Sequence, residues 1–107
     1  MKAILISFST RSKEFESNYD RNRFFRALYG WKQTINSQNK KYIYERQGLL
    51  GDIPHIRVDH SMFIIMEEHM RMMREFLEEW EEKVDWHLFN VLLDGEQRKL
   101  LRRGNDG

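Results

Sequence analysis

Histidine and aspartate are the residue types in this chain that could carry acid–base or metal chemistry. His55 and Asp59 are four residues apart and would share one face of a strand, where they could act as a general acid–base pair. The chain has no cysteine, and no two of its four histidines have the i, i+4 helical spacing of a zinc helix. We therefore predict no catalytic residue, no metal site and no cofactor. A small hydrolase or nuclease that uses His and Asp residues stays open as an alternative.

The basic residues of the first half give the main functional hypothesis. Residues 11–47 hold nine lysines and arginines against four aspartates and glutamates, with tyrosines interleaved. Nucleic-acid binding requires cations to neutralise phosphates and exposed aromatic rings to stack on unpaired bases. We expect the nucleic-acid site, for RNA or DNA, to consist of Arg21, Arg23, Arg26, Lys32, Lys40, Lys41, Tyr42, Tyr44 and Arg46. The alternative is a solvated helix face with tyrosines half-buried on a sheet.

The second half has the opposite charge. Residues 67–85 hold three lysines and arginines against eight aspartates and glutamates, although the net charge of the chain is only +1. Most of these glutamates fall off the apolar stripe of the helix expected there, as solvated positions do. They could also meet the basic half of another copy, because opposed charges steer association. A homo-oligomeric assembly module is therefore the second functional hypothesis.

Length and composition indicate one small domain. The 107 residues, 40% of them hydrophobic and 33% charged, are enough for a small core under a well-solvated surface. No apolar run approaches the length of a membrane span, and the N-terminus lacks the features of a secretory signal. We expect a soluble cytoplasmic protein without a membrane partner, with a single domain over residues 1–103 and a flexible tail over 104–107.

The first half predicts a strand, a helix and a second strand. Alternating apolar residues favour a strand over 2–9. Ser17 and Asp20 have the spacing of a helix-capping box, and an apolar stripe at helical spacing follows, formed by Phe24, Leu28, Trp31 and Ile35. Gly30 would weaken this helix or end it early. A polar linker over 34–41 and a strand over 42–46 come next.

The second half predicts a strand, a helix, a strand and a short helix. Turn residues over 48–54 indicate a long hairpin that joins the strand at 42–46 to a third strand at 55–66. The clearest helical stripe in the chain follows, formed by Met66, Met70, Met73, Leu77, Trp80 and Val84. A fourth strand is expected over 86–93 and a short basic helix over 96–103.

This order of elements points to an α+β fold. A βαββαβ chain of this size favours the ferredoxin-like split βαβ arrangement. We therefore expect a four-stranded antiparallel sheet with two helices on one face, followed by the short basic C-terminal helix.

Overall fold

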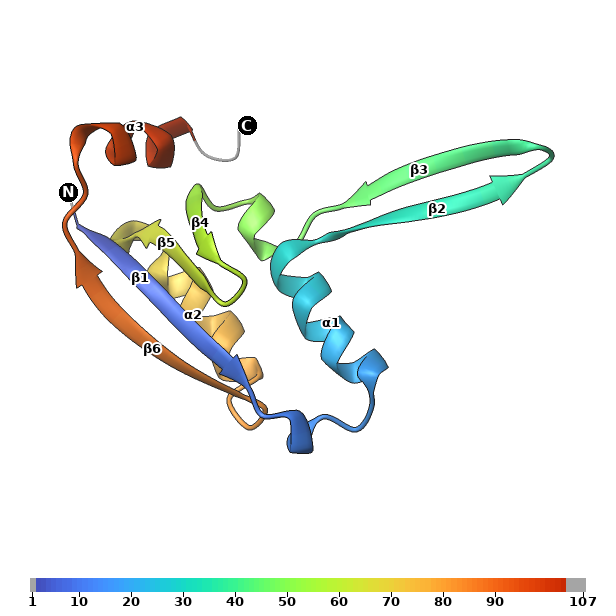
Figure 1. Cartoon of the computed structure of the whole chain (residues 1–107), viewed down its shortest axis with the longest axis horizontal. Coiled ribbons are helices and arrows are strands. Elements are labelled where there is room, and N and C mark those ends of the chain that lie inside the picture. Colours follow the sequence, from blue (N-terminus) through green and yellow to red (C-terminus); the bar gives the residue numbers. More distant parts are fainter. Residues whose placement is uncertain (1, 104–107) are drawn as a thin grey trace.

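The computed structural model describes residues 2–103 (Figure 1), so the predicted flexible tail at 104–107 lies outside the described residues. The strands are β1 (Ala3–Thr10), β2 (Trp31–Ser37), β3 (Lys40–Arg46), β4 (His55–Asp59), β5 (Met62–Met66) and β6 (Val84–Val91). The α-helices are α1 (Asn18–Tyr29), α2 (Met70–Glu79) and α3 (Gly95–Arg103). Short 3-10 helices are η1 (Ser12–Glu14), η2 (Leu49–Gly51) and η3 (Glu67–His69). The predicted mixed α+β class is confirmed.

The body of the molecule is built on a four-stranded antiparallel sheet with the order β4-β5-β1-β6. Residues that lie opposite one another on antiparallel strands share a face of the sheet. Ile6 is therefore on one face with its partners Phe63 and Leu88, whereas Leu5 is on the other face with its partners Ile64 and Phe89.

The core lies on the face that carries Ile6. Phe24 from α1 and Leu77 from α2 are fully buried in the same apolar cluster as Ile6 and Phe8. The ring of Phe24 meets that of Phe8 edge-on, with the two ring centres 5.5 Å apart. Helices α1 and α2 therefore both pack on this face (Figure 1), and burial of these large apolar side chains is the main source of the stability of the body.

Helix α1 has clear signals at both of its ends. At its start, Ser17 Oγ accepts a hydrogen bond of 3.2 Å from the backbone N–H of Asp20, which confirms the predicted cap. At its end, Gly30 has a φ of 86°, and a Cβ atom there would lie 2.4 Å from the carbonyl oxygen of Arg46. The helix stops at Tyr29 for this reason, which confirms the expectation that Gly30 could end it early; the extension of the helical stripe to Trp31 and Ile35 is wrong.

Strands β2 and β3 form a separate two-stranded hairpin that projects from the body (Figure 1). Gln38 and Asn39 form its turn with φ angles of 48° and 66°. Two successive positive φ angles are the mark of a type I′ turn, whose twist matches that of the two strands. The predicted polar linker over 34–41 is therefore wrong, because most of it belongs to the hairpin strands and their turn.

Of the predicted ferredoxin-like arrangement, the four-stranded antiparallel sheet and the two helices packed on one of its faces are present, with the strand order β4-β5-β1-β6. The predicted second strand, 42–46, lies in the projecting hairpin, outside the four-stranded sheet. The predicted third strand, 55–66, is two strands joined by a turn at His60 and Ser61, so the long hairpin expected between 42–46 and 55–66 is also wrong. Helix α2, strand β6 and helix α3 lie close to where the sequence predicts them.

Candidate nucleic-acid interface

An open groove of about 950 Å³ lies between α1, the end of β1 and the β4–β5 turn. Arg21, Arg26 and Arg57 line it, and none of the described residues along its walls is an aspartate or a glutamate. Polar and aromatic side chains complete most of its walls, among them Asn18, Asn22, Phe25, Tyr29 and His60. Guanidinium groups present several N–H donors in a fixed plane, which suits oxyanions such as phosphate.

Along one wall of the groove, two neighbouring aromatic rings lie between two arginines. The Cζ atom of Arg21 lies 5.8 Å from the ring centre of Phe25. The rings of Phe25 and Tyr29 are inclined by only 10°, with their centres 6.5 Å apart. The Cζ atom of Arg57 lies 4.1 Å from the ring centre of Tyr29. Because residues 21, 25 and 29 are one helical turn apart, α1 sets the spacing of this row.

The register of the sheet explains how Arg57 reaches α1. Arg57 is opposite Phe63, whose ring is buried in the core, so Arg57 leaves β4 on the face that the helices cover. The register then shifts between Arg57 and Asp59, and the chain turns at His60. The Tyr29 hydroxyl donates a hydrogen bond to the backbone carbonyl of His60, which ties the turn to α1.

The arginines carry the positive charge of the groove, and the neighbouring Tyr29 hydroxyl is uncharged. Burial raises the pKa of the Tyr29 hydroxyl, and the charges of Arg57 and Asp59 act on it in opposite directions. The phenol therefore stays neutral at physiological pH and acts as a hydrogen-bond donor. Asp59 is the nearby carboxylate, and it accepts a hydrogen bond of 2.7 Å from the backbone N–H of His60.

The projecting hairpin has two chemically different faces. The strand register places one set of paired residues on what we call the aromatic face: Trp31, Gln33, Ile35, Ser37, Lys40, Tyr42, Tyr44 and Arg46. The opposite face carries Lys32, Thr34, Asn36, Lys41, Ile43 and Glu45. The two faces also differ in charge. On the opposite face Lys32 lies 3.9 Å from Glu45, whereas the aromatic face carries Lys40 and Arg46 without an acidic residue. On the aromatic face, the Arg46 guanidinium donates to the amide oxygen of Gln33.

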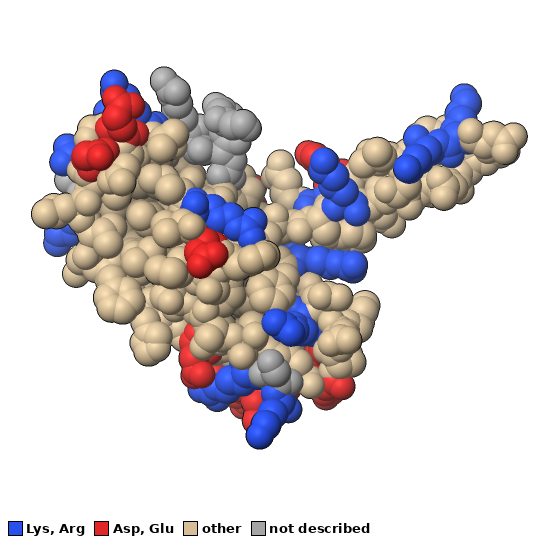
Figure 2. All heavy atoms as spheres, in the orientation of Figure 1, with Lys and Arg blue, Asp and Glu red and all other residues tan. Residues whose placement is uncertain are grey.

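The groove and the aromatic face meet at Trp31. The guanidinium of Arg26, which lines the groove, lies 4.5 Å from the ring centre of Trp31. Trp31 in turn begins the aromatic face at the base of the hairpin. Figure 2 shows Lys and Arg side chains along the hairpin and on the adjoining body. The groove and the aromatic face therefore adjoin at Arg26 and Trp31.

The predicted site residues fall in three places. Arg21 and Arg26 line the groove, and six others lie on the hairpin: Lys32, Lys40, Lys41, Tyr42, Tyr44 and Arg46. Arg23 points elsewhere, because its guanidinium lies 3.8 Å from Asp20. Sequence reasoning did not place Arg57, Phe25 or Tyr29 in this site. The spacing of Phe25 and Tyr29 along α1 beside Arg21 was an available signal for the two aromatic residues.

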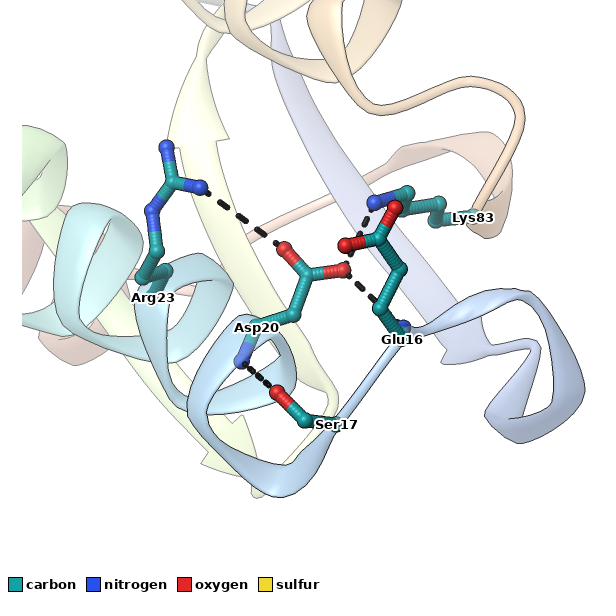
Figure 3. Close-up of polar contacts among 5 residues, drawn as sticks. All are labelled: Glu16, Ser17, Asp20, Arg23 and Lys83. Atoms are coloured by element: carbon teal, nitrogen blue, oxygen red, sulfur yellow. Dashed lines mark hydrogen bonds and ion pairs between the residues drawn. The ribbon is translucent and has the colours of Figure 1, made fainter.

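Arg23 belongs to an acidic hollow at the other side of α1, and Figure 3 shows Arg23 and Lys83 on either side of Asp20. The hollow is lined by Asp20, Arg23, Glu78, Glu79, Trp80, Glu81, Glu82 and Lys83. Asp20 Oδ2 accepts hydrogen bonds of 2.6 Å from Lys83 Nζ and 3.3 Å from the backbone N–H of Glu16. The bond from Lys83 joins the start of α1 to the segment before β6. The basic groove and the acidic hollow thus lie on different sides of α1.

The histidines have separate local contacts. His55 Nδ1 lies 2.9 Å from the carbonyl oxygen of Ile53, and His60 Nδ1 lies 3.3 Å from the guanidinium of Arg57. His69 lies 3.9 Å from a Glu68 carboxylate oxygen. Within residues 2–103, no three His, Asp or Glu side chains are grouped closely enough to hold a metal ion. These contacts give no geometric support to the alternative of a hydrolase or nuclease.

No family model, curated protein or solved structure matches this chain. Across the described residues, each helix is too short or too polar to traverse a lipid bilayer. The geometry of the groove and the hairpin is therefore the basis for a functional proposal.

Proposed function

We propose that this protein binds nucleic acid, with phosphates held in the groove and the chain of the ligand continuing along the hairpin. The observation that carries the proposal is the convergence of Arg21, Arg26 and Arg57 on one groove whose described walls contain no carboxylate residue. The three arginines come from two different elements, α1 and β4, so the fold itself gathers them.

Nucleic acid fits this surface better than a single small anion does. The groove is open and continues at Trp31 onto the aromatic face of the hairpin, which carries the further cations Lys40 and Arg46. A polymer of regularly spaced phosphates can contact such a series, and each contact releases condensed counterions. Aromatic rings among the cations, such as Tyr29 and Phe25 in the groove, supply surfaces for bases or sugars.

A charge-matched pair of variants tests the proposal. The variant Arg21→Gln/Arg57→Gln removes two guanidinium groups from the groove, and we expect its affinity for a fluorescent 20-nucleotide strand at 50 mM salt to fall about tenfold or more. Arg23→Gln/Arg71→Gln is the charge-matched control, because Arg23 lies beside Asp20 in the acidic hollow and Arg71 lies beside Glu75 on α2, both outside the groove. Fluorescence anisotropy measures both. Equal losses in the groove variant and the control would refute the assignment of the site.

A second experiment separates nucleic acid from an acidic protein as the ligand. Poly-glutamate offers regularly spaced negative charges without bases or phosphates. We expect poly-glutamate to displace the 20-nucleotide strand only at a much higher concentration of negative charges than unlabelled nucleic acid requires. If poly-glutamate competes equally well, the groove recognises acidic polymers in general and the nucleic-acid proposal is wrong.

A second candidate function, homo-oligomeric assembly, is supported by the sheet face opposite α1 and α2, where Phe89 is 53% exposed. Ile56, Ile64, Leu5 and Phe89 are neighbours in register and form an apolar row across all four strands. Strand β6 pairs with β1 on one side only and keeps a regular register over all eight of its residues. A long, regular edge strand is a ready template for pairing with another chain.

Solution mass tests the assembly candidate. We expect light scattering to show a dimer as the protein concentration rises, and Phe89→Lys to shift the mass towards the monomer. Ile43→Lys is the control, because Ile43 is an apolar residue at least as exposed as Phe89 that lies on the hairpin instead. A wild-type mass that stays monomeric up to millimolar concentration would rule this candidate out.

A further inference from the structure

The aromatic face of the hairpin exposes its rings instead of packing them against the body. Trp31, Tyr42 and Tyr44 are 37%, 44% and 47% exposed, respectively. Tyr42 and Tyr44 are two residues apart on β3, so they project from the same face of the hairpin. Trp31 lies on that face at the base of β2, where Arg26 connects it to the groove. The rings therefore form a row that begins at the groove and runs out along the hairpin.

We propose that this row is a stacking platform that makes the protein selective for single-stranded over double-stranded nucleic acid. The proposal rests on the nucleic-acid function above and names the form of nucleic acid that the same surface takes. Phosphates in the groove would anchor one part of the strand, and unpaired bases would stack on Trp31, Tyr44 and Tyr42 in turn. Stacking of this kind tolerates any sequence, because every base has an aromatic face.

Cations are placed along the row as a single strand requires. Arg46 lies opposite Trp31 at the base of the aromatic face, and Lys40 lies opposite Ser37 near the turn. Rings between two positive charges are the usual composition of single-strand binding surfaces, which combine stacking with contacts to the backbone. A duplex keeps its bases paired and stacked on one another, so it can use these cations but not the rings.

The rings can be replaced without removing the apolar contacts between the hairpin strands. Tyr42 is opposite Ile35, and leucine at position 42 keeps an apolar cross-strand pair there. Tyr44 is opposite Gln33, and the hairpin side chains form no part of the buried core cluster. Tyr42→Leu/Tyr44→Leu therefore removes the aromatic faces while the body of the molecule stays folded.

The test compares ring removal with removal of the hydroxyl groups alone. We expect Tyr42→Leu/Tyr44→Leu to weaken binding of a 20-nucleotide single strand about tenfold or more, and to change binding of the matching duplex less than about twofold. Tyr42→Phe/Tyr44→Phe keeps both rings and should bind the single strand as wild type does. Ile43→Leu, on the opposite face, is the control for a change in the hairpin. Circular dichroism confirms that each variant is folded.

The outcomes distinguish this inference from the proposed function. If wild type binds duplex as tightly as single strand, or if the leucine variant weakens both equally, the stacking platform is wrong while nucleic-acid binding stands. If the phenylalanine variant loses as much affinity as the leucine variant, hydroxyl contacts rather than stacking hold the ligand, and the inference is again wrong. If wild type binds neither form at 50 mM salt, the proposed function fails and the platform fails with it.

Discussion

Asp20 is the carboxylate that joins the first helix to the rest of the fold. It is only 8% exposed, and the hydrogen bond from Lys83, with a further one from the backbone N–H of Glu16, lowers the pKa of its side chain. Asp85 lies on the edge strand β6 and accepts a hydrogen bond from Arg11, which directly follows β1. This hydrogen bond lowers the pKa of the Asp85 carboxyl group. Both carboxylates favour the ionised form in the folded state more than in the unfolded chain.

These lowered pKa values predict a loss of stability in acid. Unfolded aspartate has a pKa of about 3.9, so the stabilisation from the charged form is fully present above that pH. It is lost as the pH falls through the lower pKa values of the folded state. We expect the free energy of unfolding, measured by urea denaturation, to fall less steeply between about pH 4 and pH 2 in Asp20→Asn than in wild type. A wild-type curve that is flat over this range would contradict the role given to these bonds.

Single residues also show how far the site could be predicted. The sequence identifies Arg21, Arg23 and Arg26 as a basic cluster, but only the packing of α1 separates Arg23 from the other two. In the structure Arg21 and Arg26 line the groove, whereas Arg23 faces the acidic hollow. Arg57 reaches the groove because it pairs with Phe63 across the sheet, and that register is not readable from the local sequence.

At the scale of elements, the hairpin depends on a close approach of backbones at its base. A Cβ at Gly30 would lie 2.4 Å from the Arg46 carbonyl oxygen, and one at Gly48 would lie 2.4 Å from the backbone nitrogen of Gly30. Glycine is required at both positions because these neighbours are backbone atoms, which cannot move aside as a flexible side chain can. The two glycines therefore set where α1 ends and where the hairpin leaves the body.

Gly30→Ala tests this element directly. We expect the unfolding free energy to fall by about 1–3 kcal/mol, because alanine there has both a steric clash and an unfavourable positive φ. Gly95→Ala is the matched control, since nothing lies within 4 Å of a Cβ at that position. Chemical denaturation of the two variants side by side measures the difference. An equal stability of the two variants would contradict the close approach.

The sequence predicts the elements with strong local signals and misses those that depend on special backbone geometry. The cap at Ser17, the first strand and the buried Met70, Met73 and Leu77 of α2 are confirmed. The hairpin was missed because its turn has Gln38 and Asn39 in place of the glycine-containing pair typical of a type I′ turn. Trp31 and Ile35 also continue the helical spacing of α1 by coincidence, which concealed the start of β2.

At the scale of the whole molecule, the hairpin makes the protein elongated, and the basic and acidic residues are concentrated on different parts of it. The radius of gyration is 15.8 Å, whereas a compact domain of this length has about 13 Å. Arginines gather in the groove and lysines on the hairpin, while the acidic hollow lies on the other side of α1. A net charge of only +1 therefore conceals a basic surface long enough to follow a polymer.

The salt dependence of binding is the most direct test of the proposed function. The three groove arginines, Arg46 and Lys40 would make five phosphate contacts with a single strand. At about −0.7 per contact, the logarithm of the association constant should fall with the logarithm of the salt concentration with a slope of about −3.5. The affinity of wild type should then fall about 100-fold between 50 and 200 mM salt. No binding at 50 mM salt, or an affinity that salt does not change, would contradict the phosphate-binding groove.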